Sequence, residues 1–160
     1  TFNQITIVIT SYKSDEKIVK CLKSINSQCK IIVVENSKNL SFKEKIEKNF
    51  TNTECLIAGE NLGYAKGNNL GLSKVKTKYA LILNPDAELE ENTLNNFFNT
   101  ANTIKNFAII GPAIQDEKNL QNNIKELSEV DSVKGFAMFL NLDKFKDVGF
   151  FDDNFFIVAF

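Results

Sequence analysis

Apolar residues fall in short runs along this chain, and longer amphipathic stretches separate the runs. Both faces of five such runs are apolar, which predicts strands covered by helices on each side of a sheet. The runs are residues 5–10, 31–35, 55–59, 79–83 and 107–110. Because strand and helix patterns alternate, their order predicts an α/β fold with a mostly parallel central sheet flanked by helices.

Two of the intervening stretches carry a helical stripe of apolar residues. One stripe is Ile18, Leu22 and Ile25, and the other is Leu94, Phe98, Ala101 and Ile104. Ser14 or Asp15 is the expected N-cap of the first helix. The last third predicts an irregular excursion over residues 113–130, another strand over 134–140 and a short capped helix over 141–145.

Length and composition predict one folded domain. The chain has 160 residues, of which 43% are hydrophobic, and this is enough for a packed core. No apolar run is long enough to cross a bilayer and no secretory signal is visible. We therefore expect a cytoplasmic location, either free or peripheral at the inner face of the membrane. A net charge of −1 without long charge runs argues against a nucleic-acid partner.

The absence of two residue types restricts the chemistry. The chain has no histidine, which excludes Ser-His, Cys-His and His-metal sites, so a general base is expected to be a carboxylate. All 19 basic residues are lysine, which removes the bidentate arginine fork that often grips phosphate. The three cysteines lack C-x-x-C spacing, and we expect buried, reduced thiols rather than a metal or redox site.

Polar segments follow three of the predicted strands, at the edge of an α/β sheet where ligands bind. They are Thr10-Ser11-Tyr12-Lys13, Glu35-Asn36-Ser37 and Asn84-Pro85-Asp86. Asp86 is followed by Glu88, and carboxylates at a strand end can hold Mg²⁺ or Mn²⁺, which in turn bind phosphates. An ordinary acidic turn is the plain alternative. The first segment has no glycine, so the dinucleotide-binding and P-loop patterns are both missing.

Residues 61–71 combine asparagines with three glycines at four-residue spacing, Gly63, Gly67 and Gly71. One interpretation is close packing of a helix on the sheet. The other is a helix N-terminus beside a diphosphate, with Asn61 and Asn68 donating hydrogen bonds. The pattern alone leaves both interpretations open.

Five motifs in order resemble the family 2 glycosyltransferases of GT-A fold, particularly the rhamnosyltransferase-like branch. They are T-S-Y-K, V-V-E-N-S, N-L-G-Y-A-K-G-N-N-L-G, L-N-P-D and V-G-F-F-D-D. The resemblance implies transfer of a sugar from a nucleotide diphosphate to an acceptor hydroxyl, with inversion and with a divalent cation. The acceptor it implies is a glycan or a lipid-linked molecule, in bacterial polysaccharide biosynthesis.

The resemblance also implies roles for individual residues. Asp86 would bind the metal, Asn84 replaces the first acid of the family's D-x-D motif, and Glu35 stands where an Asp usually accepts a hydrogen bond from the base. The donor-binding residues that it implies are Thr10, Ser11, Tyr12, Glu35, Asn36, Asn61, Gly63, Gly67, Asn68, Asn84 and Asp86.

The resemblance further implies a single domain over residues 1–160 that is C-terminally truncated. Residues 1–112 would bind the nucleotide-sugar and residues 113–160 would begin an incomplete acceptor side, with the catalytic base beyond Phe160. Asp152 and Asp153 match structural acids of the family. The aromatic residues near the end predict a homo-oligomer; they are Phe150, Phe151, Phe155, Phe156 and Phe160.

Two alternatives stay open. A non-catalytic nucleotide-sugar-binding module would explain why the expected base is missing. A nucleotidyltransferase of related fold is the other alternative, although that class usually carries a glycine-rich basic loop after its first strand, where this chain has Thr10-Ser11-Tyr12-Lys13.

Overall fold

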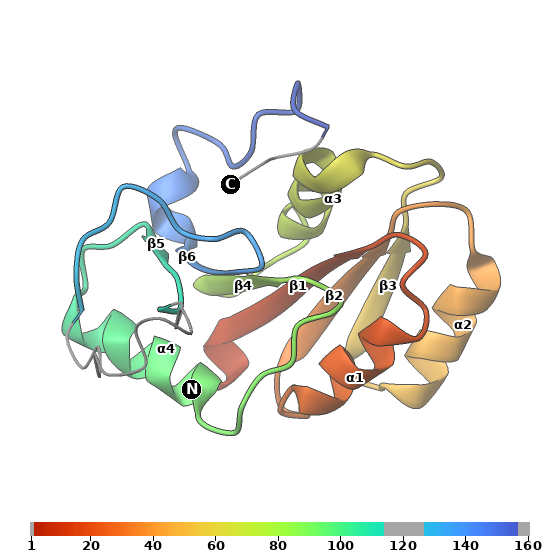
Figure 1. The fold of residues 1–160 in the computed structure, drawn as a ribbon, viewed down its shortest axis with the longest axis horizontal. Coiled ribbons are helices and arrows are strands. Elements are labelled where there is room, and N and C mark those ends of the chain that lie inside the picture. The colour runs from red at the N-terminus through yellow and green to blue at the C-terminus, as the bar shows by residue number, and fades with distance from the viewer. Residues whose placement is uncertain (1, 114–126, 157–160) are drawn as a thin grey trace, which may run out of the picture.

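The computed structural model describes residues 2–113 and 127–156, and it shows a twisted sheet between two helical layers (Figure 1). The strands are β1 (Ile5–Ser11), β2 (Lys30–Glu35), β3 (Thr53–Ile57), β4 (Tyr79–Leu83), β5 (Ile109–Ile110) and β6 (Ala137–Asn141). The helices are α1 (Lys17–Ser24), α2 (Leu40–Asn49), α3 (Gly63–Leu72) and α4 (Thr93–Thr103), with short 3₁₀ helices η1 (Phe2–Gln4) and η3 (Leu142–Phe145).

The strands form one six-stranded sheet in the order β3-β2-β1-β4-β6-β5. The first four neighbours, from β3 to β4, are parallel, while β6 is antiparallel to both β4 and β5. The predicted α/β fold with a mostly parallel sheet is therefore confirmed. Most of the excursion predicted over residues 113–130 lies outside the described residues.

The two faces of the sheet are buried under different helices. Alternate strand residues such as Ile7 and Leu81 form one core cluster with α1, α2 and α4, while Val8 and Ile82 form a second with Leu72 at the end of α3. Figure 1 shows α3 and η3 on one side of the sheet and α1, α2 and α4 on the other. Because both faces are covered, the central strands carry apolar residues at consecutive positions.

Several local predictions needed correction. Helix α1 begins after Glu16, and the Ser14 hydroxyl donates to the Tyr12 carbonyl rather than capping the helix. Strand β5 is only two residues long because main-chain pairing with β6 covers only Ile109 and Ile110. In α4, Phe97 is buried and Phe98 is only partly buried, so the stripe is rotated by one residue at this point, and Ile104, which follows the helix, is exposed.

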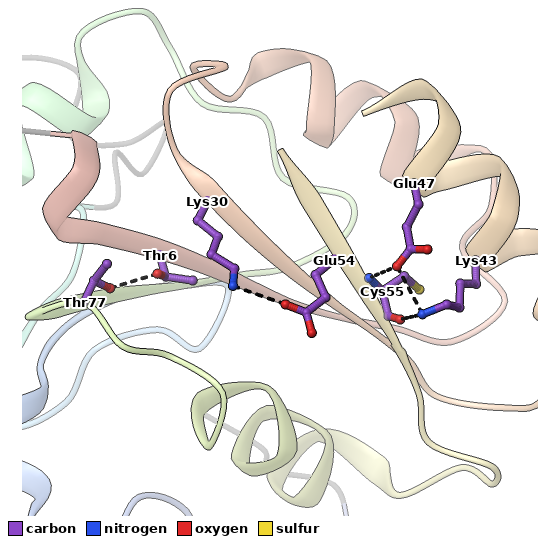
Figure 2. A network of polar contacts seen from close by, with 7 residues as sticks. All are labelled: Thr6, Lys30, Lys43, Glu47, Glu54, Cys55 and Thr77. Carbon is purple, nitrogen blue, oxygen red and sulfur yellow. Dashed lines mark hydrogen bonds and ion pairs between the residues drawn. The ribbon is translucent and has the colours of Figure 1, made fainter. Parts of the chain in front are cut away.

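Side chains of α2 occupy the outer edge of β3, the last strand on that side of the sheet (Figure 2). The Cys55 N–H donates to Glu47 Oε1 at 2.8 Å, and Lys43 Nζ donates to the Cys55 carbonyl at 2.5 Å. Lys43 and Glu47 also form an ion pair at 3.1 Å. An edge strand exposes unpaired N–H and C=O groups to other chains, and here α2 satisfies both groups of Cys55.

Within the described residues, no helix is both long and apolar enough to pass through a bilayer. All three cysteines are free and buried, as the sequence predicts.

Candidate functional site

The parallel register brings the ends of β1, β2 and β4 to one edge of the sheet. Ser11 and Glu35 are paired at the ends of β1 and β2, and the Asn36 N–H donates to the Ser11 carbonyl at 2.8 Å. Strand β4 is paired with β1 as far as Val8 and Ile82, so Thr10 and Asn84 lie at equivalent positions just beyond this pair. The three polar segments singled out in the sequence are therefore neighbours in the structure.

Glu35 is buried at the end of β2, and its carboxylate is hydrogen-bonded within the protein. Only 4% of the residue is exposed. Oε1 accepts from the Ser37 hydroxyl at 2.6 Å, and Oε2 accepts from the N–H groups of Ser37 and Asn39 at 3.1 and 3.0 Å. These three bonds hold the turn that leads into α2.

Asn36 faces the start of α3 and is also buried. Its Nδ2 donates to Asn61 Oδ1 at 3.0 Å and to the Gly63 carbonyl at 3.2 Å, and its Oδ1 accepts from the Leu62 N–H at 3.0 Å. The amide thereby ties the loop before α3 to the end of β2. These contacts are structural; contact between Asn36 and a donor stays a prediction.

Helix α3 lies close to β1 because it carries glycine at the contact points. A Cβ added to Gly67 would lie 2.5 Å from Thr10 Cγ2, and one added to Gly71 would lie 2.4 Å from Val8 Cγ1. Next to Gly67, Asn68 accepts from the Thr10 hydroxyl at 3.1 Å. Its Nδ2 donates to the carbonyl of Tyr64 one turn earlier. Close packing therefore explains Gly67 and Gly71, and Asn68 links the helix to the sheet.

The first amides of α3 are occupied by groups of the protein. The Gly63 N–H donates to Asn61 Oδ1 at 3.1 Å, and the Tyr64 N–H donates to the Phe156 carbonyl at 3.0 Å. Gly63 has φ +74°, and its added Cβ would overlap the Phe156 carbonyl. The structure thus gives Gly63 a conformational role, and an anion at this helix start would have to compete with existing hydrogen bonds.

The segment after β4 carries the exposed acid. The Asn84 N–H donates to the Phe136 carbonyl at 2.9 Å, and its own carbonyl accepts from Ala87 N–H at 3.1 Å, which closes a turn around Asp86. The Asp86 side chain is 55% exposed and lies 4.0 Å from Lys17 Nζ at the start of α1. Asp86 therefore lies in the space between the β4 exit and the helix that follows β1.

The Cys21 thiol lies next to this turn, and the nearby acids affect its pKa. It donates to the Asn84 carbonyl at 3.6 Å, and burial is the main cause that raises its pKa to about 12. The negative charges of Asp86 and Glu88 raise that pKa further. Two neighbouring acids fit a hard cation that takes its remaining ligands from phosphate and water. Within the described residues, no cluster of three or more Cys, Asp or Glu groups forms a complete protein cage.

The rim of the edge also carries exposed groups. Tyr12 is 42% exposed, and Lys13, whose φ is +51°, holds its Nζ 5.2 Å from the Tyr12 ring centroid. Asn61 and Lys66 are exposed as well. Of the sequence-predicted residues, Tyr12, Asn61 and Asp86 are thus open to a ligand, whereas Ser11, Glu35, Asn36, Gly63, Gly67 and Asn68 are buried.

Sequence reasoning missed two residues that hold residues 151–156 on α3. Asn69 exchanges hydrogen bonds with the main chain of Phe151, at 2.8 and 3.0 Å, and donates to Asp153 Oδ1 at 2.6 Å. The Tyr64 ring meets the Phe151 ring edge to face at 5.7 Å, and its hydroxyl donates to the Gly135 carbonyl. The only signal was their place inside the motif of residues 61–71.

The aromatic residues near the C-terminus do not share one environment. Phe151 is partly buried against α3, whereas Phe150, Phe155 and Phe156 are 37%, 60% and 53% exposed. Phe160 lies outside the described residues. Self-association through the exposed residues stays a prediction.

Two hollows lie away from the strand ends. One of about 520 Å³ is lined by Phe2, Asn3, Gln28 and Asn95, at the opposite edge of the sheet. The other, of about 400 Å³, lies between α1 and α2 and is lined by residues such as Val19 and Ile46. Neither hollow is lined by the polar residues at the ends of β1, β2 and β4.

Comparison with known proteins gives the same fold. The low-salt glycan biosynthesis hexosyltransferase Agl10 of Haloferax volcanii is 24% identical, over 97% of this chain and 58% of its own length. The mannosyltransferase PcManGT from Pyrobaculum calidifontis, in complex with GDP-Man and Mn²⁺, matches with a TM-score of 0.78 at 14% identity, over 94% of this chain and 48% of that chain. S. aureus TarS 1-349 in complex with UDP-GlcNAc matches with a TM-score of 0.68 at 16% identity, over 91% of this chain and 47% of that chain.

The chain thus spans about half the length of these relatives. The structural matches confirm the GT-A fold that the motifs imply. Residues 6–158, which are nearly the whole chain, match the family described as glycosyl transferase family 2. This chain belongs to glycosyl transferase family 2.

Proposed function

We propose that this chain is the nucleotide-sugar-binding part of a transferase that moves a sugar to an acceptor hydroxyl with inversion. The observation that carries the proposal is Asp86, an exposed carboxylate just beyond β4, at the same edge of the sheet as the ends of β1 and β2. Family membership supports the reaction class. Relatives whose structures contain GDP-Man with Mn²⁺ and UDP-GlcNAc support a nucleotide-sugar as the ligand.

Asp86 fits a divalent cation because it is exposed and is followed two residues later by a second acid, Glu88. Mg²⁺ and Mn²⁺ bind one or two carboxylates and fill their other positions with water and substrate phosphates. When bound, such a cation would stabilise the negative charge that the leaving nucleoside diphosphate gains. Asn84 replaces a first acid and contributes an uncharged side chain, so Asp86 would be the principal protein ligand.

The other residues act by holding the edge rigid. Asn68 and Asn36 tie α3 to β1 and β2, and a preorganised edge lowers the cost of ordering a bound nucleotide. Tyr12 offers an exposed ring at the end of β1 on which a base can lie. With no arginine in the chain, lysines such as Lys13 and Lys66 supply the positive charge near the phosphates.

An inverting transfer also needs a group that accepts the proton of the acceptor hydroxyl. We assign that role to none of the described acids near the C-terminus. Asp153 accepts a hydrogen bond from Asn69, and Asp152 accepts from the N–H of Asn154. These contacts support structural roles for both acids.

The test is calorimetric titration of the protein with UDP, GDP or TDP, with and without Mn²⁺. We expect Mn²⁺-dependent binding by the unmodified protein and a loss of about tenfold or more in affinity for Asp86→Asn, which removes one charge from the ligand set. Asp147→Asn, a change at an exposed acid elsewhere, is the matched control and should leave binding unchanged. Equal affinity of Asp86→Asn and the unmodified protein would refute the metal role.

A further inference from the structure

We infer, on the basis of the proposed function, that Glu35 is a positioning residue that holds the loop after β2, and that the nucleotide base is recognised by other groups. Glu35 stands at the carboxyl end of β2, at the position where the motifs imply an acid that accepts a hydrogen bond from the base. The geometry of its carboxylate gives it a different task.

The Glu35 carboxylate has little capacity left to accept a hydrogen bond from a ligand. A carboxylate has about four lone-pair positions. Three are taken by the Ser37 hydroxyl and by the N–H groups of Ser37 and Asn39, at 2.6, 3.1 and 3.0 Å. The residue is only 4% exposed. Oε1 keeps one free position, but because the residue is buried, an N–H group of a base could reach it only if the surrounding protein moved.

The length of the Glu35 side chain allows it to hold both ends of the turn before α2. Glu35 Oε2 reaches forward over the turn to the Asn39 N–H, and Asn39 is the N-cap of α2, whose Oδ1 accepts from the Phe42 N–H at 3.0 Å. A carboxylate near the start of a helix is also favoured by the helix dipole. Aspartate is one methylene shorter, so at this position it could not hold both ends of the turn in the same way.

Asn36, the residue after Glu35, holds a second loop at the same strand end. Glu35 holds the start of α2, while Asn36 holds the loop before α3 through Asn61, Leu62 and Gly63. Two consecutive side chains thus fix two helices to the end of one strand. Because Glu35 and Asn36 are adjacent, we expect a change in the Glu35 turn to displace Asn36 and the loop before α3, and so to affect every nucleotide to the same degree.

Three variants of Glu35 distinguish a residue that positions the loop from one that recognises the base. Glu35→Gln keeps the length and an acceptor oxygen but loses the charge. Glu35→Asp keeps the charge but loses the reach, and Glu35→Ala loses both. Glu44→Gln, at an exposed acid on α2, is the control. The measurements are the Kd values for UDP, GDP and TDP with Mn²⁺, and amide hydrogen exchange at Ser37 and Asn39, in proteins whose folding is checked by near-UV circular dichroism.

We expect Glu35→Gln to bind all three diphosphates with affinities changed by one common factor, so that their ratios stay within about twofold. We expect faster exchange at the Asn39 amide by tenfold or more in Glu35→Asp and Glu35→Ala, and much less change in Glu35→Gln. A tenfold change in the ratio of Kd values in Glu35→Gln, with Glu35→Asp behaving as the unmodified protein, would overturn the inference.

Failure of the proposed function gives a different result. If the unmodified protein binds none of the three diphosphates, that function is refuted, while the exchange rates still decide the inference. Unchanged exchange of the Asn39 amide in all three variants would then overturn the inference. Slower exchange in Glu35→Gln than in Glu35→Asp and Glu35→Ala would support it.

Discussion

At the scale of single residues, the glycines of α3 show that close approach is a requirement of this fold. A Cβ at Gly71 would lie 2.4 Å from Val8 Cγ1 and 3.2 Å from Val34 Cγ2, and valine side chains in strands have few alternative rotamers. Alanine has the better helix propensity by about 1 kcal/mol, but overpacking a core costs about 1–3 kcal/mol. We therefore expect Gly71→Ala to be destabilising by up to about 2 kcal/mol in urea denaturation.

The matched control for this change is Lys66→Ala, at an exposed position of the same helix. It should change the free energy of unfolding by less than about 0.5 kcal/mol. If Gly71→Ala were as stable as this control, the strand would have room for the methyl group and packing would not explain the glycine.

Lys17 is expected to compete with a cation for the Asp86 carboxylate. Its Nζ lies 4.0 Å from Asp86, and both side chains are largely exposed. A pair at this distance in water is worth about 1 kcal/mol or less, and a cation at Asp86 would have to overcome it. We expect Lys17→Ala to strengthen Mn²⁺ binding by about two- to fivefold at low salt, with Lys20→Ala unchanged. The difference should shrink at high salt because the charges are screened. Weaker Mn²⁺ binding in Lys17→Ala would contradict this account.

The sequence could name the residues of the candidate site, but it could not say which of them contact the protein and which are open to a ligand. Motif order singled out Asn36, Asn61 and Asn68, and all three lie at the predicted edge. Whether an amide meets a ligand or the protein depends on where α3 packs, because Thr10 and Asn68 are 58 positions apart and Asn36 and Asn61 are 25 apart. No local pattern encodes such contacts, so the buried roles of Asn36 and Asn68 were visible only in the structure.

At the scale of elements, the strands were predictable and helix α2 was not. Strands buried on both faces leave continuous apolar runs, which are easy to see in the sequence. Helix α2 buries only Phe42 and Ile46, among lysines and glutamates, so its stripe is too narrow to stand out. The helix is specified by its context, since Asn39 caps it and Lys43 and Glu47 bind the β3 edge.

The contact between Glu47 and β3 predicts a pH dependence of stability. The Cys55 N–H, followed by Lys43, holds the pKa of Glu47 below its ordinary value of 4.5. A carboxyl whose folded pKa is lowered contributes stability above its unfolded pKa, and the contribution disappears as the pH falls through the folded pKa. Since the side chain is 35% exposed, solvent screening limits the effect to about 0.5–1 kcal/mol.

Urea denaturation of Glu47→Gln and the unmodified protein at several pH values measures this term. We expect the variant to be less stable at pH 7 and the difference to disappear as the pH falls through the lowered pKa of Glu47. Glu44→Gln, on the exposed face of α2, should show no such pH-dependent difference. A constant difference at all pH values would mean that the charge of Glu47 has no part in holding the edge.

At the scale of the whole molecule, the three cysteines report whether the domain unfolds as one unit. Cys21, Cys29 and Cys55 are fully buried members of one core cluster that joins α1, β2 and β3. Burial is the first cause that raises the pKa values, to about 12 for Cys21, about 11 for Cys29 and about 12 for Cys55. The thiolate is the reactive form, so the native protein should react far more slowly than a free thiol at pH 8.

A cooperative domain exposes all three thiols in the same transition. We therefore expect labelling with a thiol reagent to be slow for all three cysteines in buffer, and to accelerate together along the urea transition measured by circular dichroism. Mass spectrometry of labelled peptides separates the three sites, and glutathione under the same conditions calibrates the reagent. Fast labelling of Cys29 alone, before the global transition, would show that the start of β2 opens independently of the sheet. Such opening would contradict the proposal that the nucleotide-binding edge is held rigid, because β2 carries both Glu35 and the loop of Asn36.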